Sequence, residues 1–182
     1  MTTNELQEKL DEFIKPKYPD IKIEVIDTAD NQREVYFTEE KFRDLFLLQR
    51  YHHLVHLIPD EFLKEHLSDS IWFELAPGEN PEELDFLDDE TIDEIKDIIL
   101  AILKDKVDFV KKLDVLFCVE SATCFGDFRH SKKILSELKF SDQEQFDIFH
   151  VLMHEGGFCD CEILYNVFRE SEYSQRYWEK DK

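Results

Sequence analysis

Gly156-Gly157-Phe158-Cys159-Asp160-Cys161-Glu162 joins a glycine pair to two closely spaced cysteines. The glycines allow the positive backbone angles that end a helix, so they close the helix predicted to begin after Ser141. Asp160 is a favourable cap for a further helix, which would carry Cys161 in its first turn. The stretch therefore predicts two helices joined by a turn that presents two thiols.

Cys124-Phe-Gly-Asp-Phe-Arg-His130 lies upstream and adds a third cysteine and an imidazole. The glycine inside it permits a turn, so the two stretches could bring Cys124, His130, Cys159 and Cys161 to one point. Thiolates and imidazoles are ligands that zinc prefers, and four protein ligands give a closed, structural site. We therefore predict a zinc site with these four ligands. His154, just before the glycine pair, is an alternative ligand to His130.

Two other interpretations of the cysteines stay open. Free cysteines are often buried only because the thiol packs as a small apolar group. Cys159 and Cys161 could instead form a reversible disulfide, and so tight a ring would be strained and easily reduced. The second interpretation predicts a thiol redox protein in place of a metal-binding one.

The predicted fold class is α+β, with a change of composition that marks two modules. Between Glu79 and Asp97 ten residues are acidic and Lys96 alone opposes them. Such a run is typical of a solvated connector or helix surface, or of a surface that docks a basic partner. We predict an α/β module over residues 1–86 and an all-helical module over residues 87–182.

Helical spacing and period-two alternation predict the order α-β-β-α-α-β for the first module. Asp30-Asn31 supply the turn between the first two strands, and Pro59 separates the last two helices. The expected elements are a helix that starts after Thr2 and ends before Pro16 and Pro19, strands over 21–26 and 35–37, helices over 39–58 and 59–67, and a strand over 70–76.

The second module is predicted to contain helices alone. Ser141-x-x-Glu144 has the pattern of a capping box, as does Thr91-x-x-Glu94. The charged tail from Arg169 is expected to fray, although Tyr173, Tyr177 and Trp178 could dock onto a partner or onto the core. The expected helices cover residues 91–104, 107–119, 128–138, Ser141 to the glycine pair, and a last segment that contains Ile163 to Phe168.

The carboxyl-terminal region resembles a small bacterial domain family of unknown function. The matching features are Cys124, the Arg129-His130 pair, and the Gly-Gly-aromatic-Cys-Asp-Cys-Glu motif that runs into Leu164-x-Asn166-Val167. The likeness covers roughly residues 113 to 168. Because the activity of that family is not established, the resemblance implies a domain and no mechanism.

The element order of residues 3–76 looks like the BolA-like fold, a relative of the KH fold. Tyr51-His52-His53-Leu54-Val55 resembles the family's Arg-His-Arg helix motif, and Ser70-Ile71-Trp72-Phe73 would be its last strand. BolA proteins share an iron–sulfur cluster with monothiol glutaredoxins through a histidine on that strand. Trp72 stands where that histidine would be, so the resemblance does not imply a cluster site here. The Gly-x-x-Gly loop by which KH domains hold nucleotides is missing as well.

The net charge of -21 excludes some classes of partner. Sequence-independent binding to nucleic acid depends on Lys and Arg, and the same negative field would repel an anionic membrane. No run of eighteen apolar residues predicts a membrane span, and no secretory signal opens the sequence. We therefore expect a cytoplasmic protein with reduced thiols.

The sequence has no motif that predicts catalysis. Gly-x-Ser-x-Gly and the glycine-rich loops that hold phosphates are missing, and paired carboxylates carry little information in a chain with 43 Asp and Glu. We predict a non-catalytic protein that binds zinc and docks an unidentified protein partner. The sequence does not predict the oligomeric state.

Overall fold

The computed structural model of the chain describes residues 1–28 and 32–179. Its contacts divide the chain into two compact units, the N-terminal unit Met1–Asp85 and the C-terminal unit Phe86–Lys182. A three-stranded sheet lies in the first, and the second is helical, so the predicted α+β class is confirmed. None of the described helices is both long and apolar enough to cross a bilayer.

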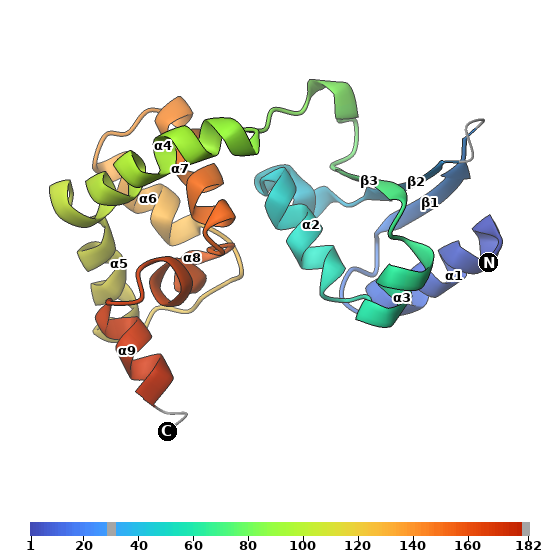
Figure 1. Ribbon diagram of the computed structural model, residues 1–182. Helices are drawn as coiled ribbons and strands as arrows, with labels where there is room; N and C mark the ends of the chain where they lie inside the picture. Colours follow the sequence, from blue (N-terminus) through green and yellow to red (C-terminus); the bar gives the residue numbers. More distant parts are fainter. Residues whose placement is uncertain (29–31, 180–182) are drawn as a thin grey trace. The chain divides into compact units, whose positions relative to one another are not determined.

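The N-terminal unit has the predicted order of helices and strands (Figure 1). Strands β1 and β2 pair antiparallel, whereas β2 and β3 pair parallel, which leaves β3 at an edge of the sheet. The turn predicted at Asp30-Asn31 lies outside the described residues. The bounds are α1 Thr3–Ile14, β1 Lys22–Asp27, β2 Arg33–Thr38, α2 Leu47–Val55, α3 Asp60–His66 and β3 Ser70–Leu75.

Alternation along the strands decides which face of this sheet is buried. Val35 and Phe37 of β2 are fully buried, while Tyr36 between them is only partly buried and stacks on Phe73. Leu6 and Leu10 of α1 recur at helical spacing and belong to the same core as the buried strand residues. The three helices therefore cover one face of the sheet.

The helix predicted over 39–58 is interrupted. A short 3₁₀ helix covers Glu40–Asp44, and α2 begins only at Leu47 because Leu45 and Phe46 are extended. The buried side chain of Arg50 explains the break, since its Nε donates to the Leu45 carbonyl and its guanidinium binds the carboxylate of Glu79. A long-range ion pair of this kind leaves no periodic signal in the sequence.

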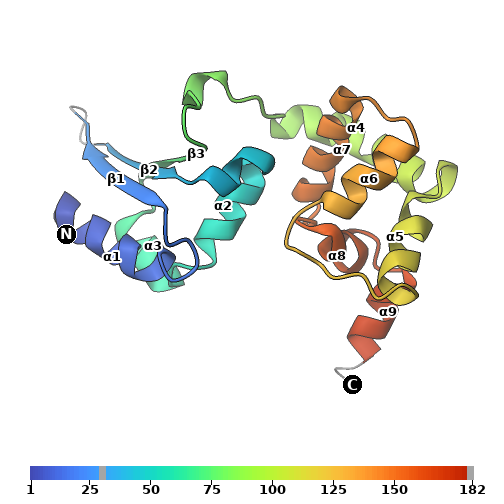
Figure 2. The same ribbon diagram turned by 180° about the vertical axis from the view of Figure 1, so that it is seen from behind.

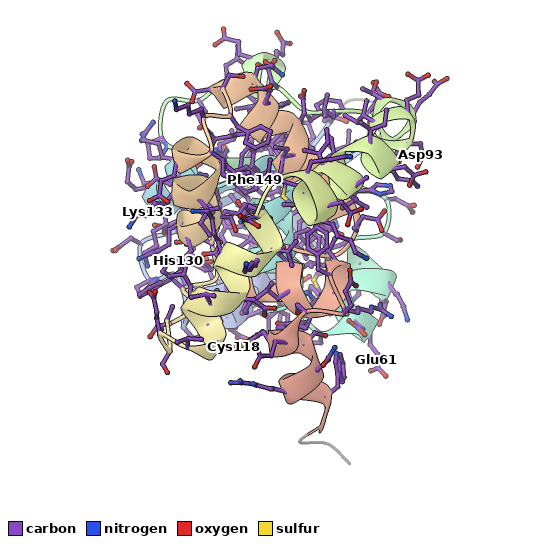
Figure 3. All side chains as sticks on the ribbon, turned by 90° about the vertical axis from the view of Figure 1, so that its left-hand side faces the viewer. Glu61, Asp93, Cys118, His130, Lys133 and Phe149 are labelled. Carbon is purple, nitrogen blue, oxygen red and sulfur yellow. The ribbon has the colours of Figure 1, made fainter. Side chains whose placement is uncertain are left out.

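The C-terminal unit consists of helices (Figure 2). Its core includes the fully buried aromatic rings of Phe109, Phe128 and Phe149. Helix α4 packs on α7, and α5 packs on α6. Phe149 of α7 is fully buried and stacks on Phe128 at the start of α6, and Figure 3 labels Phe149 together with His130 and Lys133 of α6. The bounds are α4 Asp89–Ala101, α5 Phe109–Cys118, α6 Arg129–Glu137, α7 Asp142–His154, α8 Asp160–Glu162 and α9 Glu172–Glu179, with π-helical turns over Ile102–Lys106 and Ile163–Val167.

The prediction that the tail from Arg169 frays is wrong for the described residues up to Glu179. The alternative, docking of a tail aromatic onto the core, is met by Tyr173, whose ring packs against Phe117. Residues Glu172–Glu179 form α9, and the backbone N–H groups of Glu172 and Tyr173 donate to the carboxylate of Asp114 on α5. A carboxylate at a helix start satisfies N–H groups that have no partner inside the helix. Because Asp114 is almost sixty residues upstream, the tail's own composition could not reveal this anchor.

Candidate metal centre

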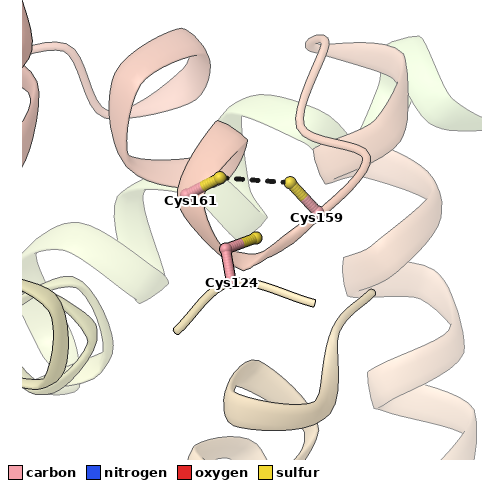
Figure 4. Close-up of side chains that lie close together, drawn as sticks. All are labelled: Cys124, Cys159 and Cys161. Atoms are coloured by element: carbon pink, nitrogen blue, oxygen red, sulfur yellow. Dashed lines mark hydrogen bonds between the residues drawn. The ribbon is translucent and has the colours of Figure 1, made fainter. Parts of the chain in front are cut away.

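Three cysteine sulfurs meet in the C-terminal unit. The Sγ atoms of Cys124, Cys159 and Cys161 all lie within 4.8 Å of one another, and Cys159 and Cys161 are 3.4 Å apart (Figure 4). Cys159 is buried and the other two are partly buried. The fourth cysteine, Cys118, lies on α5 and its thiol contacts Asp114 instead. We call the first three residues the sulfur cluster.

The glycine pair shapes the loop that carries two of these sulfurs. Gly156 has a φ of +87° and its N–H donates to the Met153 carbonyl, while the N–H of Gly157 donates to the Leu152 carbonyl. This pair of bonds is the Schellman end of a helix, as the sequence predicts. Asn166 then donates from its side chain to the Gly156 carbonyl and holds the turn against the π-helical segment.

Gly157→Ala tests how closely this turn must approach its neighbours. An added Cβ would lie 3.0 Å from Val167 Cγ2 and 3.2 Å from the backbone Cα of Ile163. Overpacking of this kind costs about 1–3 kcal/mol, so we expect the C-terminal unit to lose that much stability. Denaturant unfolding followed by Trp178 fluorescence measures this loss of stability. The chain has two tryptophans, so the measurement uses a Trp72→Phe background in which Trp178 gives the whole tryptophan signal.

Gly78→Ala is the control for that substitution. Gly78 also has a positive φ, +85°, but nothing lies within 4 Å of its added Cβ, and it belongs to the N-terminal unit. It should leave the Trp178 transition unchanged. Equal transitions for Gly157→Ala and the parent would show that the turn tolerates a side chain.

Asp160 holds the two cysteine-bearing stretches together. Its side chain is fully buried and accepts hydrogen bonds from the backbone N–H groups of His130 and Ser131, and its own N–H donates to the Asp127 carbonyl. Phe128, the residue before α6, has no side-chain acceptor, so Asp160 caps α6 from a distance. The expectation that Asp160 caps its own helix is wrong, because Cys159 occupies the cap position of α8.

The three thiols of the sulfur cluster differ in the direction in which their pKa values are shifted. Hydrogen bonds from the thiols of Cys159 and Cys161 lower the pKa of Cys124 to about 2, against the opposing effect of burial. The thiolate of Cys124 in turn raises the pKa of Cys159 and raises that of Cys161 to about 11. These opposite directions favour ionisation of Cys124 before the other two thiols, and a bound cation would favour loss of the protons from Cys159 and Cys161.

The structure does not bring either predicted histidine into the sulfur cluster. His130 Nε2 lies 3.1 Å from the Thr123 carbonyl, and its ring packs against Phe117 and Phe125. His154 is exposed in the last turn of α7, with Nδ1 beside the Glu155 carboxylate. Both imidazoles thus have other neighbours, and the described residues supply three ligands instead of four.

Tyr165 is the residue near the cluster that the sequence analysis missed. The Cys161 Sγ lies 3.7 Å from the Tyr165 hydroxyl oxygen, and burial together with this contact with sulfur raises the pKa of the phenol. Tyr165 follows Cys161 by four residues, so helical spacing could have placed it beside that sulfur. Its hydroxyl is a polar side-chain group in contact with one sulfur of the cluster.

The dimensions of the sulfur cluster fit a tetrahedral metal site. Zinc–sulfur bonds of about 2.3 Å at tetrahedral angles place two sulfurs about 3.8 Å apart. The observed 3.4 Å between Cys159 and Cys161, and the limit of 4.8 Å for the other pairs, require shifts of an ångström or less. Three thiolates are a donor set that suits soft and borderline ions.

The comparisons with known proteins bear on this region alone. Searches of curated proteins and of solved structures each gave no significant match. A family model described as a protein of unknown function, DUF2695, matches residues 118–166. The matched range contains the sulfur cluster, Asp160 and Tyr165, and the predicted resemblance to a domain of unknown function is confirmed there. The C-terminal unit therefore contains a domain of unknown function whose matched region includes the whole sulfur cluster.

Proposed function

We propose that the C-terminal unit binds a thiophilic metal ion, with zinc as the first candidate, through Cys124, Cys159 and Cys161. The observation that carries this proposal is the convergence of three sulfurs from two stretches more than thirty residues apart. Plain packing of thiols does not require three of them to meet. An ion bound by three thiolates would keep a fourth position for water, for Tyr165 or for an exogenous ligand.

Cys161→Ser tests the metal site. The parent protein, purified without a histidine tag and under reducing conditions, should contain about one equivalent of zinc. The variant should lose most of that metal, and its C-terminal unit should unfold at a lower temperature because ligation free energy is folding free energy. Elemental analysis and the Trp178 transition measure the two effects.

Cys118→Ser is the matched control, since Cys118 lies outside the sulfur cluster. It should keep the metal content and the melting temperature of the parent. Equal metal content in both variants would reject the site. Replacement by Co²⁺ gives an independent readout, because its thiolate absorption bands should appear with the parent and disappear with Cys161→Ser.

A second candidate function is thiol redox exchange by Cys159 and Cys161. The 3.4 Å between their sulfurs favours it, since one short movement would form the S–S bond. In that reaction the two thiols give two electrons and two protons to a partner's disulfide, which becomes a dithiol. The test is treatment with oxidised glutathione followed by mass spectrometry. A parent protein that is purified without metal and loses the mass of two hydrogens would favour this function, provided that Cys161→Ser shows no such loss.

The predicted likeness of the N-terminal unit to BolA proteins stays a prediction. The α-β-β-α-α-β order and the parallel pairing of β2 with β3 support it. Docking of a protein partner is likewise part of the proposal, and the acidic run from Glu79 to Asp97 supports a basic partner.

A further inference from the structure

Glu74 is a carboxylate on the covered face of the sheet in the N-terminal unit. On β3 it shares this face with Ser70 and Trp72, and it lies beside the buried Phe37 in the parallel register. The residue is 8% exposed, and its Oε1 is buried without a hydrogen-bond partner among the residues that the structure describes. A buried carboxylate without a partner destabilises a fold, so its presence points to a role in binding.

A pocket of about 470 Å³ opens beside Glu74. Its volume lies in the range of small-molecule sites, and it combines aromatic and aliphatic walls with a few polar groups. The rings of Tyr51 and Trp72 meet there with centroids 5.4 Å apart. The lining residues come from α2, α3, β3 and the turn between the last two: Tyr51, Leu63, Lys64, Leu67, Ser68, Ser70, Trp72 and Glu74.

The cations near Glu74 do not bind its carboxylate. The guanidinium of Arg50 donates to both carboxylate oxygens of Glu79 and to the backbone carbonyl of Glu74. Lys64 lies on the exposed side of α3 and forms no ion pair within the described part of the chain. Oε1 of Glu74 therefore remains a buried acceptor without a hydrogen-bond partner among the described residues, and Glu74 is one of the residues that line the pocket.

We propose that this pocket binds a small organic cation, a primary ammonium carried on an apolar or aromatic group. The ammonium donates to Oε1 of Glu74, and the apolar group packs on Trp72 and Tyr51, whose ring faces attract positive charge. The site is independent of the sulfur cluster, since every lining residue belongs to the N-terminal unit.

Fluorescence titration of the full-length Trp178→Phe protein tests this proposal, because Trp72 is then the only tryptophan. The probe is 2-phenylethylammonium, and the neutral comparison compound is 2-phenylethanol, which has the same ring and chain length. We expect a saturable change with a Kd of about 1 mM for the ammonium compound, as is usual for so small a ligand. The alcohol should bind at least tenfold more weakly.

Three variants in the same background complete the test. Glu74→Gln should weaken binding of the ammonium more than tenfold and leave the alcohol unchanged, while Glu61→Gln, on the exposed side of α3, should change neither. Lys64→Gln should keep or tighten binding, because it removes a positive charge from the pocket. Equal binding of the two compounds, unchanged binding to Glu74→Gln, or loss of binding in Lys64→Gln would each overturn the proposal.

Discussion

Asp160→Ala will destabilise the C-terminal unit by about 3 kcal/mol, even though Asp160 is not a proposed metal ligand. The substitution removes a fully buried side chain and leaves the N–H groups of His130 and Ser131 without their acceptor. Loss of a helix cap costs about 1 kcal/mol, and the buried donor left unsatisfied at Ser131 adds about 1–3 kcal/mol. Denaturant unfolding followed by Trp178 in the Trp72→Phe background measures the loss.

The same substitution should weaken metal binding. The side chain of Asp160 joins the stretch that carries Cys124 to the stretch that carries Cys159 and Cys161. Without this side chain the two stretches are held together less firmly, and the three sulfurs are no longer kept at bonding range of one ion. Asp160→Asn keeps one acceptor oxygen and should fall between the parent and Asp160→Ala in both stability and zinc affinity. A competition titration against a chromophoric zinc chelator measures the affinity.

Asp142→Ala is the control for the loss of negative charge at a helix start. Asp142 lies in the first turn of α7, where it is exposed. Surface substitutions of this kind change stability by about 0.5 kcal/mol or less. If Asp160→Ala unfolded at the same denaturant concentration as Asp142→Ala, the idea that Asp160 holds the two stretches together would be wrong.

Much of the fold could be predicted from local patterns. The capping box at Ser141, the glycine pair that ends α7 and the alternation of β1 each depend on residues within a few positions of one another. The convergence of the three cysteines was also predictable, because two cysteines two residues apart and a third near a glycine are rare in this composition. Short-range physics sufficed for the cap, the turn and the strand, whereas the cysteine prediction depended on the scarcity of cysteine and glycine elsewhere in the chain.

The features that sequence analysis missed depend on contacts across long stretches of chain. Asp160 caps α6 from thirty positions away, Asp114 anchors α9 from almost sixty, and Arg50 breaks a helix because Glu79 binds it. In each case a charged side chain forms a hydrogen bond or an ion pair with a group far away in the sequence. A local stretch of sequence contains only one of the two partners, so it cannot reveal the contact. His130 illustrates the converse, since its spacing suits a ligand but neighbouring aromatic rings and the Thr123 carbonyl occupy it.

Glu74→Gln should stabilise the N-terminal unit at pH 8 by up to roughly 3 kcal/mol and change it little at pH 5. Burial raises the pKa of Glu74 from 4.5 to about 7, which means that the fold disfavours the ionised form. Such a rise corresponds to roughly 3 kcal/mol, because one pKa unit is about 1.4 kcal/mol. Unfolding curves of Trp178→Phe proteins at pH 5 and pH 8, followed by Trp72, measure the difference.

The direction in which stability changes with pH follows from proton uptake by Glu74. Between pH 4.5 and about 7 the folded unit holds a proton on Glu74 that the unfolded chain has released, so the stability of the parent falls as the pH rises through this range. Glutamine does not ionise, so burial imposes no penalty that depends on pH. The stability of the variant should therefore not fall through this range as that of the parent does. Glu61→Gln, at an exposed position, is the control and should leave the pH dependence unchanged.

A stabilising Glu74→Gln would also bear on the proposed cation pocket. Residues that bind ligands often destabilise the free protein, because a group poised for a partner is left unsatisfied without it. A variant that is more stable at pH 8 and no longer binds 2-phenylethylammonium would show both effects at one carboxylate. Glu74→Gln that is less stable than the parent at pH 8 would mean that the carboxylate has a structural partner, and the argument from an unsatisfied oxygen would then be wrong.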